Sequence, residues 1–186
     1  MNIPNIFTLI RFILIPVIAY LLYINNGNLI ILSIFLFLFA VWTDWIDGYI
    51  ARKYNQQTTF GTFMDPLVDK TLILTILFIF ADLSLIPLWM VLLLLFREFL
   101  VTGVRQVCSS EGKIVGANWM GKSKFILQSI MVVYLQFLLY FQIKNVTNIV
   151  FNIVVGYYYT LILTVVSLIF AFNFVWWHRK TIFTNI

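Results

Sequence analysis

The sequence has little charge, a single cysteine and a single histidine. Of its 186 residues, 10% are charged, whereas 62% are hydrophobic. Cys108 is the only cysteine, which excludes an intramolecular disulfide framework and a zinc site built from cysteines. A soluble domain of this length does not bury so much apolar surface, so the composition predicts an integral membrane protein.

Two other patterns are missing. The apolar runs do not alternate with polar residues, which disfavours a transmembrane β-barrel. The net charge of +5 is not gathered on a soluble face, so no nucleic-acid partner is expected. The chain begins without a basic region ahead of an apolar one and without a small-residue cleavage site, so we expect its first span to insert and remain.

Polar interruptions divide the chain into about six apolar spans of ~20 residues, the length that crosses a hydrocarbon core. We therefore predict an all-α fold, a polytopic bundle of about six transmembrane helices that forms a single domain over residues 1–186. The interruptions between the spans are rich in residues that end helices or form turns. The expected helices are 5–24, 29–52, 63–81, 86–108, 119–142 and 149–177.

Basic residues collect on one side of this arrangement. An even number of spans places both termini on the same side, together with the interruptions at 53–62 and 109–118. That side receives most of the lysines and arginines, among them Arg52 and Lys113, while the other side keeps Lys144 and little else. By the positive-inside rule, we expect both termini and the charged stretch at the cytoplasmic face of the plasma membrane.

Four aspartates lie close together at the junction of the second and third expected helices. Asp44 and Asp47 are spaced i, i+3 at the end of the second helix. Asp65 and Asp69 are spaced i, i+4 at the start of the third. Each pair faces one side of its helix, and a short connection lets the helices pack antiparallel, so we expect the carboxylates to converge. Because such carboxylates repel unless cations separate them, the pattern predicts a site for two hard divalent ions, Mg²⁺ or Mn²⁺.

Small residues and one arginine accompany the carboxylates. Gly48 and Ala51 follow the first pair and Gly61 precedes the second, and their size lets a ligand approach the backbone closely. Arg52 supplies a planar fork that holds a phosphate. Together these residues predict a site that binds a diphosphate and breaks it with the help of metal ions.

The order of these residues resembles the signature of the CDP-alcohol phosphatidyltransferase family. D-x-x-D-G-x-x-A-R, followed after eight residues by G-x-x-x-D-x-x-x-D, is occupied at every position from Asp44 to Asp69. Three further segments are similar to the bacterial phosphatidylglycerophosphate synthase branch of that family: Asn2 to Arg11, Arg97 and Glu98 with Arg105, and Gly121 to Lys124.

The resemblance implies that an acceptor hydroxyl attacks the β-phosphorus of CDP-diacylglycerol and that CMP leaves. In this branch the acceptor is glycerol 3-phosphate and the product is phosphatidylglycerol phosphate; a homodimer in the lipid membrane is also implied. The implied ligands of the two metal ions are Asp44, Asp47, Asp65 and Asp69, with Asp69 also acting as general base. The implied contacts to cytidine and diphosphate are Gly48, Ala51, Arg52 and Gly61, with Asn5, Thr8 and Arg11 on the diphosphate side.

A phosphorylated acceptor needs cations of its own, and later spans supply them. The expected ligands of the acceptor phosphate are Arg97, Arg105, Lys122 and Lys124. Three of these residues have an alternative role: Arg97 pairs with Glu98 inside the bundle, and Lys122 and Lys124 anchor the chain to anionic lipid.

Other functions remain open at this stage. A different acceptor, such as serine, inositol phosphate or a phosphatidyl lipid, keeps the reaction, and two departures from the branch pattern, Phe125 and Met64, bear on that choice. A small ion transporter predicts carboxylates scattered through several spans, whereas here they cluster at one end of two spans. An inactive lipid-binding scaffold predicts the loss of a signature residue, and none is lost.

Overall fold

The computed structural model describes residues 3–53, 59–110, 119–144 and 149–183, and within these ranges the chain forms helices and no strand. The predicted all-α fold is confirmed, with a helix at each expected place. The largest differences are that α3 begins four residues earlier than expected, at Thr59, and that α6 continues to Phe183. The helices are α1 (Ile3–Tyr23), α2 (Gly27–Lys53), α3 (Thr59–Asp82), α4 (Leu88–Ser110), α5 (Trp119–Ile143) and α6 (Ile149–Phe183).

Four helices in the described part of the chain are long and apolar enough to cross a membrane. These spans are Asn5–Tyr23, Gly27–Ile46, Lys124–Ile143 and Val154–Arg179. The sequence predicted about six; α3 and α4 have similar lengths but carry charged side chains near their middles, which lower their apolar character. The chain is a polytopic α-helical membrane protein in which α3 and α4 carry charged residues near their middles.

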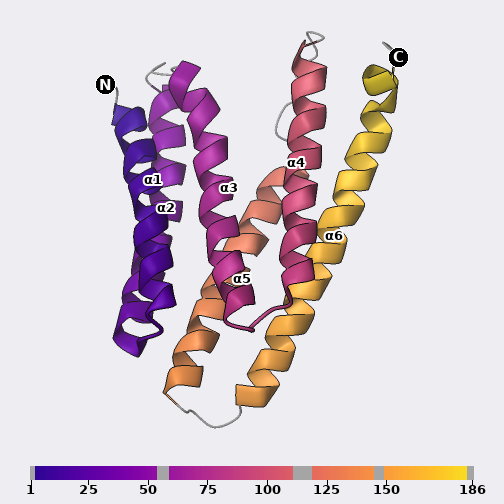
Figure 1. Ribbon diagram of the computed structural model, residues 1–186. Coiled ribbons are helices and arrows are strands. Elements are labelled where there is room, and N and C mark those ends of the chain that lie inside the picture. The colour runs from indigo at the N-terminus through magenta and orange to yellow at the C-terminus, as the bar shows by residue number, and fades with distance from the viewer. Residues whose placement is uncertain (1–2, 54–58, 111–118, 145–148, 184–186) are drawn as a thin grey trace.

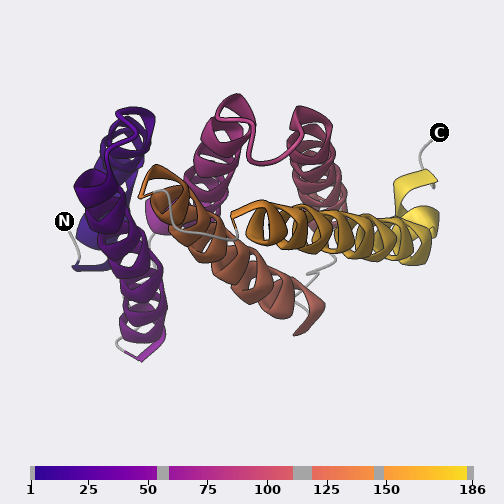
Figure 2. The same cartoon turned by 90° about the horizontal axis from the view of Figure 1, so that it is seen from below.

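The helices run up and down the bundle in two groups (Figure 1). Helix α1 packs against both α2 and α3, and α4 packs along α6. Helix α5 crosses between the groups and contacts α2, α3 and α6 (Figures 1 and 2). Helix α1 begins and α6 ends at the same end of the bundle, where α2 ends and α3 begins (Figure 1).

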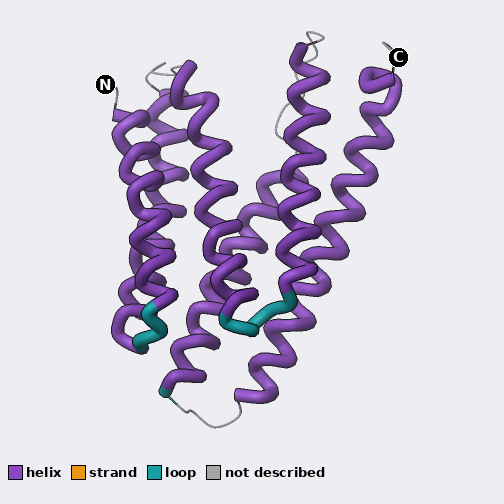
Figure 3. The backbone as a smooth tube through the Cα atoms, viewed as in Figure 1, coloured by secondary structure: helices purple, strands orange, loops and turns teal. Residues whose placement is uncertain are grey.

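Two turns at the opposite end are closed by residues with positive φ (Figure 3). Asn25 follows α1 with φ 56°, and Ser84 follows α3 with φ 59°. After α3, the Leu85 N–H donates to the Phe80 carbonyl at 2.9 Å and the Ser84 N–H donates to the Ala81 carbonyl at 3.1 Å. This pair of bonds is a Schellman motif, which ends α3 and starts the turn toward α4.

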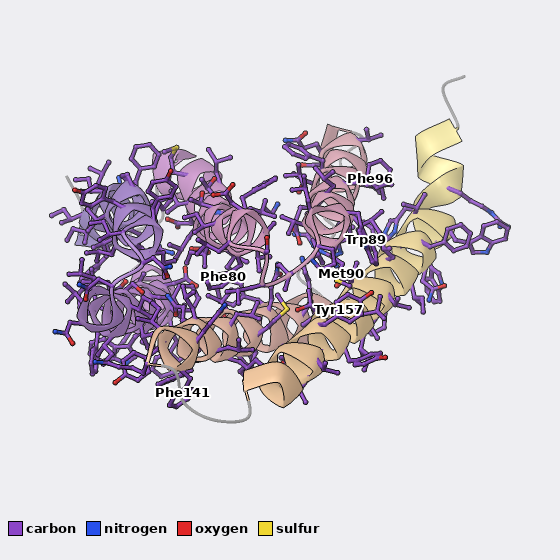
Figure 4. The ribbon with its side chains drawn as sticks, turned by 60° about the horizontal axis from the view of Figure 1, so that its bottom comes forward. Phe80, Trp89, Met90, Phe96, Phe141 and Tyr157 are labelled. Atoms are coloured by element: carbon purple, nitrogen blue, oxygen red, sulfur yellow. The ribbon has the colours of Figure 1, made fainter. Side chains whose placement is uncertain are left out.

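Large apolar side chains fill the interior and also cover much of the outside. Phe80 of α3 and Met90 of α4 are fully buried, whereas Trp89 and Phe96 of α4 are largely exposed (Figure 4). Lipid tails are as apolar as leucine, so outward aromatic side chains carry no penalty in a bilayer. The bundle is therefore held mainly by close packing and by polar contacts between helices.

Candidate active site

Arg11 of α1 lies among three carboxylates from α2 and α3. Its side chain is 0% exposed, and its Nη1 donates to Asp44 Oδ1 at 2.6 Å and to Asp69 Oδ1. Its Nη2 lies 3.6 Å from Asp65 Oδ1. We call Asp44, Asp65 and Asp69 the carboxylate cluster. One guanidinium thus joins three helices at the stretch that carries the aspartates.

Thr8 provides a second link between α1 and the carboxylate cluster. The buried Thr8 hydroxyl donates to Asp65 Oδ1 at 2.5 Å. Because Thr8 and Arg11 are spaced i, i+3, they share one face of α1, and Asn5 lies one turn earlier on that face. The residues expected on the diphosphate side therefore line up on the face of α1 that meets the aspartates.

Helical spacing also places the glycines beside the cluster. Gly48 lies four residues after Asp44 on α2, and the buried Gly61 lies four residues before Asp65 on α3. Four expected site residues fall on described helices, although their side chains lie outside the described part of the structure: Asp47, Ala51 and Arg52 on α2, and Lys122 on α5.

The donor atoms of the carboxylate cluster suit a hard divalent cation. Among the described side chains, no group of three or more His, Cys, Asp or Glu residues is arranged to hold a metal ion. The three carboxylates of the cluster instead share Arg11, and one guanidinium leaves their negative charge in excess. Their side chains are 20% to 37% exposed, so they remain accessible. Carboxylate oxygens in excess of their counter-charge fit Mg²⁺ or Mn²⁺.

A cavity of about 220 Å³ lies between α3, α4 and α5, next to the carboxylate cluster. Two acidic side chains, Asp69 and Glu98, line this cavity. Asp69 therefore belongs both to the carboxylate cluster and to the cavity wall. We call this space the basic cavity, because its lining includes four basic side chains: Lys70, Arg97, Arg105 and Lys124. The excess of positive charge suits a phosphate monoester dianion.

Glu98 is in contact with two of these basic residues. Its Oε1 accepts a hydrogen bond from Arg97 Nη1 at 3.1 Å and also contacts Lys124 Nζ. All three residues are buried, and Arg97 Nε donates to the Ser167 carbonyl of α6 at 3.4 Å. The ion pair expected as an alternative role for Arg97 is therefore present in the wall of the basic cavity.

Lys70 is a cavity residue that the sequence analysis did not single out. Its Nζ donates to the Thr102 hydroxyl at 2.5 Å, and that hydroxyl donates to the Glu98 carbonyl at 2.7 Å. One signal could have identified Lys70: a charged side chain in an apolar helix is costly unless it has a function.

A further cavity of about 390 Å³ lies between α3 and α4 and shares Lys70 and Arg105 with the basic cavity. Its wall includes Leu67 and Phe99, which are 49% and 70% exposed. We call it the side cavity. Apolar exposed residues on its wall place it at the lipid-facing surface of the bundle.

The fold and these charged features define a class: a polytopic helical membrane protein with a carboxylate cluster beside a basic cavity. Comparison with known sequences specifies the class further. The sequence model of the CDP-alcohol phosphatidyltransferase family matches residues 1–172, and the chain belongs to that family.

Three curated relatives carry the name CDP-diacylglycerol–glycerol-3-phosphate 3-phosphatidyltransferase. The chain is 41% identical over 143 residues to the one from Bacillus subtilis (strain 168), which covers 70% of this chain and 74% of the relative. It is 44% identical over 130 residues to the one from Rickettsia typhi, covering 68% and 71%. It is 34% identical over 139 residues to the one from Salmonella choleraesuis, covering 72% and 76%.

Proposed function

We propose that this chain transfers the phosphatidyl group of CDP-diacylglycerol to glycerol 3-phosphate and releases CMP. Membership of the family, the names of its relatives and the complete aspartate signature support this reaction. One observation carries the proposal: Asp69 contacts Arg11 within the carboxylate cluster and also lines the basic cavity. A group that faces both sides is suited to act between a nucleotide lipid and a phosphorylated alcohol.

The carboxylate side binds the nucleotide lipid. The residues that would hold two divalent ions, Mg²⁺ or Mn²⁺, are Asp44, Asp47, Asp65 and Asp69. Such ions, when bound, neutralise the diphosphate and the departing CMP. The residues proposed to line the cytidine and diphosphate are Gly48, Ala51, Arg52 and Gly61, with Asn5, Thr8 and Arg11 on the facing side of α1.

The basic cavity binds the acceptor. The side chains proposed to bind the acceptor phosphate are Lys70, Arg97, Arg105, Lys122 and Lys124. Held there, the acceptor presents its hydroxyl to Asp69. The Asp69 carboxylate takes the hydroxyl proton as the oxygen attacks the β-phosphorus, and the bond from that phosphorus to the CMP oxygen breaks.

The setting of the reaction follows from charge and from the family. We propose that residues 1–186 form one domain in the plasma membrane, with both termini and the site at the cytoplasmic face, because basic residues dominate that side. We also propose a homodimer.

A different acceptor is the second candidate. The excess of basic residues in the cavity favours a phosphorylated alcohol over serine, because serine brings no dianion to balance that charge. Inositol phosphate is therefore the acceptor that competes with glycerol 3-phosphate.

Acceptor choice is tested directly with the purified full chain in lipid nanodiscs. The protein is supplied with CDP-diacylglycerol, Mg²⁺ and one alcohol at a time from a panel of glycerol 3-phosphate, inositol phosphate, serine and glycerol, and CMP release is measured. We expect release with glycerol 3-phosphate and none when EDTA replaces Mg²⁺. The Asp69→Asn variant is the matched control for release that does not depend on the site. Release with another alcohol and none with glycerol 3-phosphate overturns the assignment.

A further inference from the structure

Glu98 is an acidic residue in a wall otherwise dominated by basic side chains. Resting on the proposed function, we propose that Glu98 is the positioning residue of the acceptor site, which holds Arg97 and Lys124 where the acceptor phosphate meets them. Its Oε1 is shared by Arg97 Nη1 at 3.1 Å and by Lys124 Nζ. The two cations come from different helices, α4 and α5, so one carboxylate oxygen fixes their separation.

The surrounding charge explains why a carboxylate belongs in a site for an anion. Arg97, Lys124 and Glu98 are each at most 9% exposed, so water does little to screen the two cations from each other. Buried like charges repel and are costly to desolvate unless an opposite charge lies between them. Glu98 supplies that charge, and the basic side chains of the cavity still outnumber the acidic ones. Positive charge therefore remains for a phosphate.

Contacts around Glu98 extend to the rest of the cavity wall. Its carbonyl accepts a hydrogen bond from the Thr102 hydroxyl at 2.7 Å, and Thr102 in turn accepts one from Lys70 Nζ at 2.5 Å. Arg97 is held from its other side by the Ser167 carbonyl at 3.4 Å. Since Lys70 directly follows Asp69 on α3, this network relates the cations of the cavity to the general base.

A purely structural role makes a different prediction. Glu98 joins α4 to α5 through Lys124, and an ion pair that only holds helices together affects stability. If the ion pair has only this role, its loss lowers kcat/KM for both substrates equally. A positioning residue instead affects the step that depends on the acceptor and leaves binding of the nucleotide lipid unchanged.

The test compares Glu98→Gln, Glu98→Asp and the wild-type chain, each full-length in nanodiscs with Mg²⁺. The readouts are kcat and KM for each substrate and the thermal unfolding midpoint. Glutamine keeps a hydrogen-bond acceptor but loses the charge. We expect Glu98→Gln to lower kcat/KM for glycerol 3-phosphate by about tenfold or more, with KM for CDP-diacylglycerol within about twofold of wild type. Glu98→Asp, which restores the charge, is expected to recover part of the loss.

Asp82→Asn is the matched control, because Asp82 is an exposed carboxylate at the other end of α3. It is expected to behave as wild type. The proposal is overturned if Glu98→Gln keeps kcat/KM for glycerol 3-phosphate within about twofold, or if both substrates lose equally while the unfolding midpoint falls. If Glu98→Gln does not fold, the same comparison of the two substrates in Glu98→Asp decides the matter.

The outcome for Glu98 is separable from that for the proposed function. Wild-type protein that turns over another alcohol but not glycerol 3-phosphate overturns the function, and the same variants then test Glu98 with the alcohol that is used. Wild-type activity with glycerol 3-phosphate, together with unchanged Glu98 variants, overturns only the role of Glu98.

Discussion

Arg11 of α1 and Asp44 of α2 form a hydrogen-bonded ion pair of 2.6 Å. The same guanidinium contacts Asp65 and Asp69 on α3, so one side chain of α1 holds the aspartates of two other helices. In the absence of bound cations, Arg11 supplies the positive charge that allows these carboxylates to lie close together. This arrangement leads to a prediction about stability as well as about activity.

Replacing Arg11 with methionine should destabilise the chain when metal ions are removed. Breaking a buried ion pair from one side costs about 3–5 kcal/mol, because the remaining charges stay unpaired. Thermal unfolding in EDTA measures the loss. Adding Mn²⁺ should raise the unfolding midpoint more in the variant than in wild type, because the ion supplies the missing positive charge.

The control for Arg11 is Lys144→Met, which removes an exposed cation just after α5. We expect it to unfold like wild type with or without metal. An Arg11→Met variant as stable as wild type in EDTA contradicts the role of Arg11 as counter-charge.

Asp69→Asn should abolish most turnover while the nucleotide lipid still binds. Loss of a general base lowers kcat by about 10²–10⁴-fold, and an asparagine keeps the shape of the side chain. Steady-state CMP release gives kcat, and KM for CDP-diacylglycerol should stay within a few-fold of wild type. Turnover close to wild type removes Asp69 from the role of base.

Lys70→Met should weaken use of the acceptor selectively. A hydrogen bond to a charged group contributes about 1.5–3 kcal/mol, so KM for glycerol 3-phosphate should rise about tenfold or more. KM for CDP-diacylglycerol should not change. Equal increases in both KM values place Lys70 outside the acceptor site.

Ser84 allows a prediction about the fold alone. Its φ of 59° lies in the left-handed region, which costs a residue with a β-carbon about 1–2 kcal/mol and costs glycine little. Ser84→Val should lower the free energy of unfolding further, by on the order of 1 kcal/mol, because branching at the β-carbon adds to the strain that serine already carries. Ser84→Gly should be slightly stabilising, because relief of this strain is offset in part by the larger conformational entropy that glycine loses on folding. The unfolding midpoints of both variants measure the effect, and a stable valine variant contradicts the turn geometry.

Helix positions followed from the sequence because each helix is a long apolar run between polar interruptions. The two main differences have local causes. At the end of α6, Arg179 lies 3.9 Å over the ring of Trp176, and His178 Nδ1 is 2.8 Å from the Phe174 carbonyl. Contacts at spacings i, i+3 and i, i+4 support a helix beyond its apolar span. At the start of α3, residues 59–62 were expected to belong to the connection between helices, but they form the first turn of the helix.

The sequence predicted the relative positions of site residues only where they lie on the same helix, because spacing along a helix determines which residues share a face. The i, i+4 spacing of Asp65 and Asp69 placed both on one face of α3, and the structure has both in contact with Arg11. Contacts between helices depend on how the helices rotate against each other, which spacing does not encode. For this reason neither the pairing of Arg11 with Asp44 nor the contact between Lys70 and Thr102 followed from the sequence.

Asp69 of α3 contacts Arg11 and also lines the basic cavity, whereas Lys70, the next residue, contacts Thr102 of α4. The two substrates also differ in origin, since one arrives by diffusion within the bilayer and the other from water. Rotation of α3 about its axis by one residue, about 100°, would move the Asp69 carboxylate away from one of the two substrates. The rotational setting of α3 therefore governs whether a membrane-confined reactant and a dissolved one meet at the same oxygen.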